Sequence, residues 1–202
     1  MRVLFSDANI VLISSVQHLV ALFSADWLKE NKLISEPPIQ TFNIPGLSVF
    51  NSKTYRLIAN DERIQIVTVS DKKEHLETIA NVIEKYIESS GSLPFKAIGF
   101  NFHFNVEIEE QEQIIQIHHK YIDNISSLFP DHSMNYGAII YAKNEDYQLR
   151  VVIDPIEENI FRYGFNYHIN IEGIDHNKLL ESLNKILEFY NTAKDFVNKA
   201  SG

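Results

Sequence analysis

The sequence predicts a single α+β domain, an antiparallel or mixed β-sheet with helices packed mainly on one face. Two observations lead to this class. Short segments rich in β-branched and aromatic residues alternate with longer segments whose apolar residues recur every three or four positions. A nine-residue segment, GFNFHFNVE at 99–107, is also closely matched by GFNYHINIE at 164–172, which indicates an internal duplication.

The N-terminal segment is predicted to form a strand and a helix. Residues 9–13 are an apolar run typical of a short buried strand, and apolar residues at helical spacing follow within 16–32. The segment Glu36-Pro37-Pro38 ends this helix, because proline keeps the preceding residue out of the helical region. Asp7 has no second carboxylate nearby in the sequence, and we interpret it as a turn residue rather than a catalytic one.

Three strands are predicted next, over 47–50, 54–59 and 63–69, because these segments are rich in β-branched and aromatic residues. Pro45-Gly46 indicates a turn before the first of them. The polar segment Asn60-Asp61-Glu62 suits the turn of a hairpin between the second and the third.

A helix is predicted over 71–90. Asp71 is its expected N-cap, since Glu74 follows three residues later in the spacing of a capping box. Apolar residues then form one face of the helix, and Ser89-Ser90-Gly91 ends it.

The first copy of the repeated segment lies in a predicted strand over 95–108. The acidic segment 109–112 suits the N-terminus of a further helix, where the helix dipole favours negative charge, and Pro130 ends that helix. The strands that follow are predicted over 136–142, 147–153 and 161–172, and the last of these contains the second copy. A turn at Lys143-Asn144-Glu145-Asp146 is expected between the first two of these strands.

The final helix is expected to begin at Asp175, its predicted N-cap, and carries an apolar stripe. The members of the stripe alternate in steps of four and three residues: Leu179, Leu183, Ile186, Tyr190, Ala193 and Val197. Such spacing is typical of a coiled-coil seam between two copies of a chain. Further apolar residues beside the stripe favour the alternative, a helix that lies on its own sheet.

The two copies divide the domain, residues 1–202, into two pseudo-repeats that follow the N-terminal strand and helix. Their boundaries fall at about 47–129 and 134–199, and the 71–90 helix is inserted only in the first. Two or three short strands with one helix would be marginal as an independent unit. We therefore expect the duplication to lie within one domain.

Alternation along each copy separates an apolar face from a polar face. The apolar face is expected to pack against the helices. The polar face repeats the same residue types, and we select these as candidate binding residues: Asn101, His103, Asn105, Glu107, Asn166, His168, Asn170 and Glu172. If a pseudo-twofold axis relates the copies, the two polar stripes lie side by side on one surface.

Three interpretations of these polar residues are open. They form the solvated outer face of an antiparallel sheet, or they bind a partner or a small polar ligand through amide and imidazole groups. In the third interpretation they act in catalysis, or hold a divalent metal through histidine and glutamate. Asparagine is poor in strands, so four asparagines at matching positions favour a role beyond solvation.

Composition narrows the classes of function. The 202-residue chain contains no cysteine, which excludes disulfides, thiolate metal sites and a cysteine nucleophile. Its net charge of −9 disfavours a protein that holds nucleic acid through phosphate contacts. The apolar segment 10–23 is too short and too polar to span a membrane, and it makes a poor signal peptide. We therefore expect a cytoplasmic protein.

The sequence contains no zinc-binding His-Glu-x-x-His helix, nucleophile turn, phosphate-binding loop or dinucleotide fingerprint. No catalytic residue, metal ligand or cofactor is predicted on this basis. We expect a non-enzymatic binding protein that acts through a protein partner or through self-association, with the C-terminal helix as the contact in a homodimer. The alternative is a metal-dependent or hydrolase-like enzyme that uses His103, His168, Glu107 and Glu172.

Overall fold

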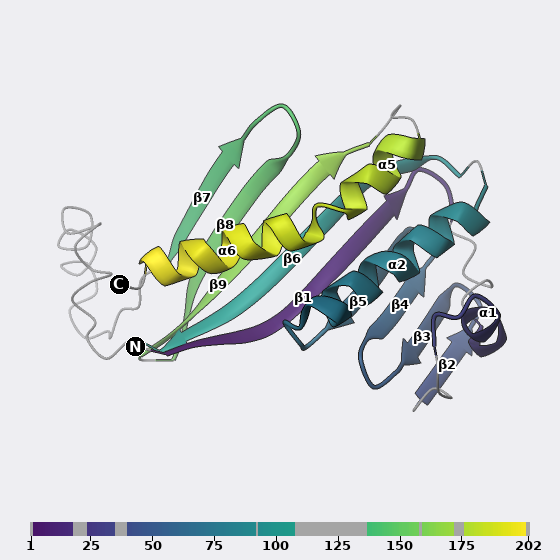
Figure 1. Ribbon diagram of the computed structural model, residues 1–202, viewed down its shortest axis with the longest axis horizontal. Helices are drawn as coiled ribbons and strands as arrows, with labels where there is room; N and C mark the ends of the chain where they lie inside the picture. Colours follow the sequence, from purple (N-terminus) through teal and green to yellow (C-terminus); the bar gives the residue numbers. More distant parts are fainter. Residues whose placement is uncertain are drawn as a thin grey trace.

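The computed structural model describes residues 2–17, 24–34, 40–91, 93–107, 137–157, 159–171 and 176–200. Over these ranges the chain forms a nine-stranded antiparallel sheet with helices on one face (Figure 1), which confirms the predicted α+β class. In chain order the elements are β1 (Arg2–Ser14), α1 (Ala25–Glu30), β2 (Gln40–Ile44), β3 (Leu47–Asn51), β4 (Arg56–Asn60), β5 (Arg63–Thr68), α2 (Lys73–Ser89), β6 (Phe95–Glu107), β7 (Ala138–Lys143), β8 (Gln148–Glu157), β9 (Ile160–Asn170), α5 (His176–Leu183) and α6 (Ile186–Ala200). None of the described helices is long and apolar enough to cross a membrane.

The strand order across the sheet is β2-β3-β4-β5-β1-β6-β9-β8-β7. The strands β6 and β9, which contain most of the two repeated segments, are therefore neighbours. They pair in antiparallel register about Asn101, which lies opposite Asn166. The duplication itself stays a prediction, because β1 lies between β5 and β6 whereas β8 adjoins β9 directly.

The apolar face of the central strands forms the core under α2 and α6 (Figure 1). Aromatic residues of β6 and β9 are fully buried there, among them Phe102, Phe104 and Phe165. Phe189 of α6 stacks on Tyr167 of β9 with ring centroids 4.3 Å apart. Each such buried ring contributes about 2 kcal/mol or more of hydrophobic stabilisation, so this face of the sheet holds the helices.

Two of the predicted elements have different limits in the structure. The strand predicted over 9–13 begins at Arg2, because residues 2–8 pair with β6. The helix expected within 16–32 is described only as α1, six residues long. The predicted helix that follows 109–112 and the expected cap at Asp175 lie outside the described residues.

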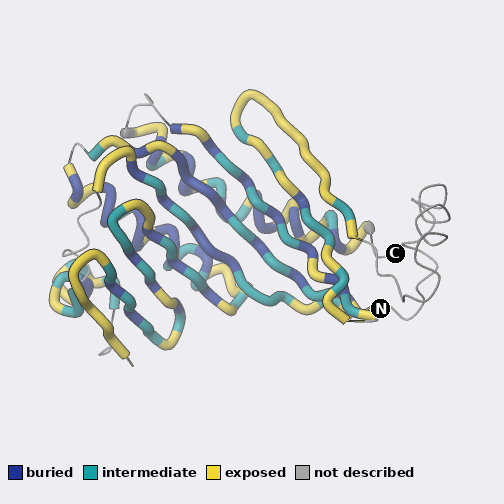
Figure 2. Tube along the Cα trace, turned by 180° about the vertical axis from the view of Figure 1, so that it is seen from behind, coloured by how far each residue is buried: buried dark blue, intermediate teal, exposed yellow. Residues whose placement is uncertain are grey.

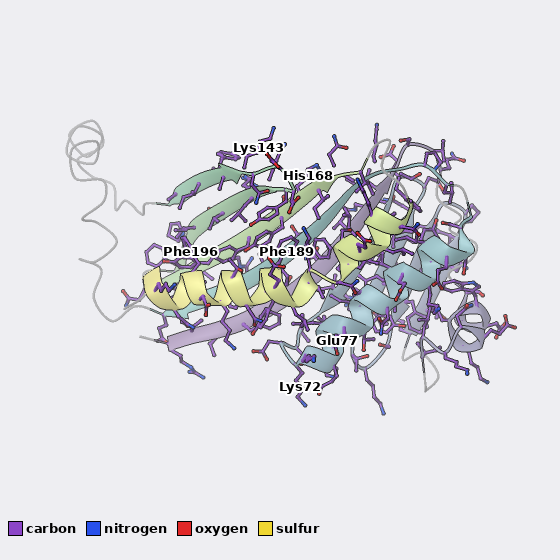
Figure 3. The ribbon with its side chains drawn as sticks, turned by 45° about the horizontal axis from the view of Figure 1, so that its top comes forward. Lys72, Glu77, Lys143, His168, Phe189 and Phe196 are labelled. Carbon is purple, nitrogen blue, oxygen red and sulfur yellow. The ribbon has the colours of Figure 1, made fainter. Side chains whose placement is uncertain are left out.

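The final helix is divided in two. Its backbone N–H groups at Asn184 and Lys185 donate to carbonyls three residues earlier, so a tight turn separates α5 from α6. The predicted apolar stripe is buried in the protein's own core at Leu183, Tyr190 and Val197. Figure 3 shows Phe189 and Phe196 on α6 beside the sheet, and Phe196 makes an edge contact with Phe165.

The prediction that Asp71 caps α2 by its side chain is wrong. Lys72 occupies the N-cap position, and no side chain caps the helix there. The Asp71 carboxylate instead accepts a hydrogen bond of 2.9 Å from the hydroxyl of Tyr190 and lies 3.7 Å from the Lys194 ammonium. A partner on α6 therefore replaces the local capping interaction and joins the two helices.

The two hairpin turns expected from the sequence are confirmed. The side-chain oxygen of Asn60 accepts from the N–H groups of Glu62 and Arg63, and that of Asn144 accepts from Asp146 and Tyr147 in the same way. Such turns close both hairpins through local hydrogen bonds. The edge strand β2 was not predicted, and all five of its residues are exposed.

We expect Tyr190→Phe to lower the free energy of unfolding by about 1 kcal/mol, because the substitution removes the hydroxyl that donates to Asp71. Urea denaturation is the measurement. The matched control is Tyr141→Phe on β7, whose side chain is 74% exposed and which should leave stability unchanged. If both variants unfold like the wild type, the Tyr190–Asp71 hydrogen bond does not stabilise the fold.

Candidate functional site

The side of the sheet opposite α2, α5 and α6 is called the open face here. Figure 2 views the protein from this side, and strands form the near surface with many residues partly or fully exposed. Alternation places every second residue of each strand on the open face. The same alternation buries the residues between them, as in Phe100, Phe102 and Phe104.

Seven of the eight candidate binding residues lie on the open face. Glu107 and Asn170 are exposed, and five are half-buried: Asn101, His103, Asn105, Asn166 and His168. Glu172 lies outside the described residues. The two polar stripes are therefore side by side over the residues that the structure describes, as the register of β6 with β9 requires.

Three asparagines form a chain of amides across neighbouring strands. Asn166 donates to the side-chain oxygen of Asn101 at 2.6 Å, and Asn101 donates to that of Asn9 at 2.9 Å. Asn9 in turn donates weakly to the Asp7 carboxylate at 3.5 Å. A carboxylate accepts but does not donate, so Asp7 fixes the direction in which each amide donates. We call Asn9, Asn101 and Asn166 the amide chain.

Asp7 also binds His103. The carboxylate oxygen lies 2.8 Å from the ring Nδ1, and a bulge between Phe5 and Asp7 brings the two residues opposite each other. Burial alone raises the pKa of the Asp7 carboxyl. The hydrogen bond and charge of His103, with hydrogen bonds from Ser6 and Asn9, outweigh this effect and hold the pKa below its ordinary value.

The interpretation of Asp7 as a turn residue is wrong, because Asp7 lies within β1. Neither Asp7 nor Asn9 was selected from the sequence. A sequence pattern that indicates both residues does exist: polar Asp7 and Asn9 alternate with apolar Ala8 and Ile10, as polar and apolar residues do in the repeated segments. The strand was predicted to begin too late to include Asp7.

Gly164 makes room for the ring of His103. A Cβ atom at this position would lie 3.2 Å from Cδ2 and 3.5 Å from Nε2 of the imidazole. The corresponding glycine of the first copy, Gly99, is less constrained, because its nearest neighbour would be the Asn166 Nδ2 at 3.5 Å. The pairing sets each glycine opposite the histidine of the other strand.

The two histidines do not converge. In the register, His103 lies opposite Gly164 and is therefore four residues from His168 along the sheet, a separation of about 13 Å at the usual rise per residue. Ligands of one metal ion lie about 2 Å from it, so these two cannot share an ion. The described residues contain no group of three histidine, cysteine, aspartate or glutamate side chains placed to hold a metal.

Asn105 does not join the amide chain. Its side-chain oxygen is buried and has no hydrogen-bond partner among the described residues. Its strand neighbours in the register are Leu4 on β1 and Arg162 on β9. The amide chain and the Asp7–His103 pair therefore form the hydrogen-bonded centre of the open face, and Asn105 lies outside it.

Two shallow hollows lie beside this centre and share Arg150 and Asn166. The larger, of about 550 Å³, surrounds Gly164 and includes His103 and Arg162. We call it the Gly164 hollow. The smaller, of about 380 Å³, lies toward the edge strand β7, and Figure 3 labels two of the residues that line it, Lys143 and His168.

Positive charge gathers on the open face. All five arginines of the chain lie on strands, and the alternation and register place each of them on this side of the sheet, together with one lysine: Arg2, Arg56, Arg63, Arg150, Arg162 and Lys143. The carboxylates that share the face on the described strands are fewer: Asp7, Glu107, Asp154 and Glu157. The open face is thus locally basic in a chain whose net charge is −9.

The two glycines provide a matched pair of substitutions. We expect Gly164→Ala to lower the free energy of unfolding by about 1 kcal/mol more than Gly99→Ala, because the new methyl group presses on a ring that Asp7 holds in place. Urea denaturation measures the difference, and NMR resonances of the His103 ring should move only in Gly164→Ala. Equal stabilities with unchanged resonances would contradict this packing.

Asp7→Asn should alter the pH dependence of stability. A carboxyl whose pKa is lowered by folding contributes stability above its ordinary pKa of about 4, and this contribution is lost as the pH falls through the folded-state pKa. Urea unfolding at a series of pH values should therefore show a difference between wild type and variant that is constant near neutrality and shrinks below about pH 4. If the difference in free energy of unfolding between wild type and Asp7→Asn does not vary with pH, folding does not lower the pKa of the Asp7 carboxyl.

Comparison with known proteins supplies no family for the chain. No protein-family model matches it, and no curated protein is similar to it in sequence.

Proposed function

We propose that this is a non-enzymatic binding protein whose open face receives a protein partner. The amide chain is the observation that carries the proposal. Asparagine is disfavoured in strands, yet three asparagines on adjacent strands occupy one row and bind one another. Hydrogen bonds among these side chains hold them in fixed positions before any ligand arrives, and such preorganisation lowers the entropic cost of binding.

The composition around the amide chain supports recognition of a polar partner. Arginine is enriched at protein interfaces and binds carboxylates through two parallel hydrogen bonds. Arg150 and Arg162 are exposed beside the chain, and both line the Gly164 hollow. A polar partner with acidic groups would meet complementary charge at this face.

Self-association remains a part of the proposal, but the C-terminal helix offers little to a second copy. Its apolar stripe is already buried against the sheet. Exposed apolar side chains occur instead on the edge strand β7, where Ile139 and Tyr141 are 55% and 74% exposed. Contact between copies would therefore use a sheet edge, a common route for strand pairing between chains.

Two further parts of the proposal rest on the sequence. We propose that the repeated segments arose by internal duplication, because each copy contributes one glycine, one asparagine and one histidine to the paired centre of the sheet. We also propose that the protein works in the cytoplasm, since the absence of cysteine suits a reducing compartment.

The test is quantitative binding of a partner that has been captured with the wild-type protein, identified and purified. Replacing His103 and His168 together by alanine should weaken the affinity about tenfold or more, because both side chains lie on the open face. The matched control is Lys73→Ala with Lys178→Ala, two exposed side chains on helices of the opposite face.

Folding is monitored in the same experiment, because His103 also bonds to Asp7. Arg150→Ala serves as a second variant, since the described residues give its side chain no hydrogen bond or ion pair whose loss would disturb the fold. The proposal is overturned if every open-face substitution leaves the affinity for the partner unchanged while the helical control weakens it.

A further inference from the structure

We propose that the Gly164 hollow binds a carboxylate side chain from an acidic segment of the protein partner. This inference rests on the proposed function and adds the chemistry that the open face recognises. Four features of the hollow carry it: two arginines that reach it from different strands, their lack of internal partners, the orientation of His103, and the shallow shape of the site.

The arginines flank the hollow along the sheet. Arg150 of β8 lies opposite Asn166, and Arg162 of β9 lies opposite Asp154. Gly164 stands between these two pairs, and the ring of His103 packs over it in the space that a side chain would fill. The two guanidinium groups reach the hollow from different strands, and each can bind a carboxylate through two parallel hydrogen bonds.

Neither guanidinium is neutralised within the described part of the chain. Arg162 and Asp154 are direct neighbours in the register, but no ion pair joins them there. Arg56, on the same face, differs because its Nε donates to Asn51 at 2.8 Å. Arg150 and Arg162 thus keep their hydrogen-bond donors for a ligand, whereas Arg56 has an internal acceptor and serves as the matched control.

His103 is a third polar side chain at the hollow, beside the two arginines. Its Nδ1 is held by Asp7, and its Nε2 lies on the side of Gly164. Because the Asp7 carboxylate only accepts hydrogen bonds, Nδ1 donates to it, and Nε2 is the ring nitrogen left for a ligand in the hollow. One carboxylate, Asp154, lines the hollow together with the two arginines, so positive groups outnumber it, and nearby Asp7 is bound to His103.

The shape of the Gly164 hollow favours a carboxylate that belongs to a larger partner over a free small molecule. Sites for free small molecules bury most of the ligand surface in an enclosed pocket. The Gly164 hollow is open to solvent and is lined by residues of β6, β8 and β9, so it suits a single group presented by a larger partner. A polynucleotide is disfavoured, because the residues that line this hollow present no exposed aromatic side chain on which bases could stack.

The test uses short peptides as probes and NMR titration of the full chain as the readout. The acidic probe is an acetylated, amidated pentaglutamate, and its control is the pentaglutamine of the same length. We expect saturable shifts at residues of the Gly164 hollow with the acidic peptide and none with the neutral one. Arg150→Gln and Arg162→Gln should each weaken binding about tenfold, since hydrogen bonds to charged groups contribute about 1.5 kcal/mol.

Two controls make the assignment specific. Arg56→Gln removes one positive charge from the same face and should leave the affinity within about twofold, because loss of an isolated surface charge has a small effect. Gly164→Ala presses a methyl group against the His103 ring in the hollow and should weaken binding, whereas Gly99→Ala should not. If all three arginine variants weaken the acidic peptide equally, the interaction is diffuse attraction and the proposed site is wrong.

Further probes distinguish other sources of an oxyanion. Inorganic phosphate or a single-stranded oligonucleotide that binds the hollow more tightly than the peptide would overturn the assignment to a carboxylate. Failure here is separable from failure of the proposed function. If no probe binds but open-face substitutions still weaken the affinity for the purified partner, only this inference is wrong. If open-face substitutions leave that affinity unchanged, the proposed function is wrong as well.

Discussion

The antiparallel pairing of β6 with β9 is the interaction on which the rest of the structure depends. It places Asn101 opposite Asn166 and thereby sets which side of both strands faces the helices. A shift of one residue would exchange the two faces, because side chains alternate along a strand. The buried aromatic residues of both strands oppose such a shift, since it would expose every one of them to water. The apolar face fixes the register, and the polar face follows from it.

The open face shows how polar residues are accommodated beside a tightly packed core. An amide that lost its hydrogen bonds on partial burial would destabilise the sheet by about 1 to 3 kcal/mol. The amide chain avoids most of this loss because each side chain binds the next, and Asp7 receives the last donor. The bulge in β1 is part of the same arrangement, because it brings Asp7 opposite His103. A set of side chains with fixed donors and acceptors is thus presented on the sheet, which is why we propose recognition for this face rather than simple solvation.

The opposite face depends on contacts between elements far apart in the chain. Tyr190 packs in the core against Phe5, Phe102 and Phe104, while its hydroxyl binds Asp71 at the start of α2. One side chain therefore joins β1, β6, α6 and the segment before α2. Because the helices cover this face, we assign the proposed binding surface to the open face and to the edges of the sheet.

The sequence by itself determined the local features of this protein. Alternation in the repeated segments predicted which side of β6 and β9 is buried, and short polar segments predicted both hairpin turns, because these features depend on neighbouring residues. The partners of Asp7 and Asp71 were decided by tertiary structure. Local spacing made the first a turn residue and the second a helix cap, yet each binds a residue about a hundred positions away. Strand register, the bulge in β1 and the gathering of all five arginines on one face arise from pairing between distant segments, and no local pattern of residues encodes that pairing.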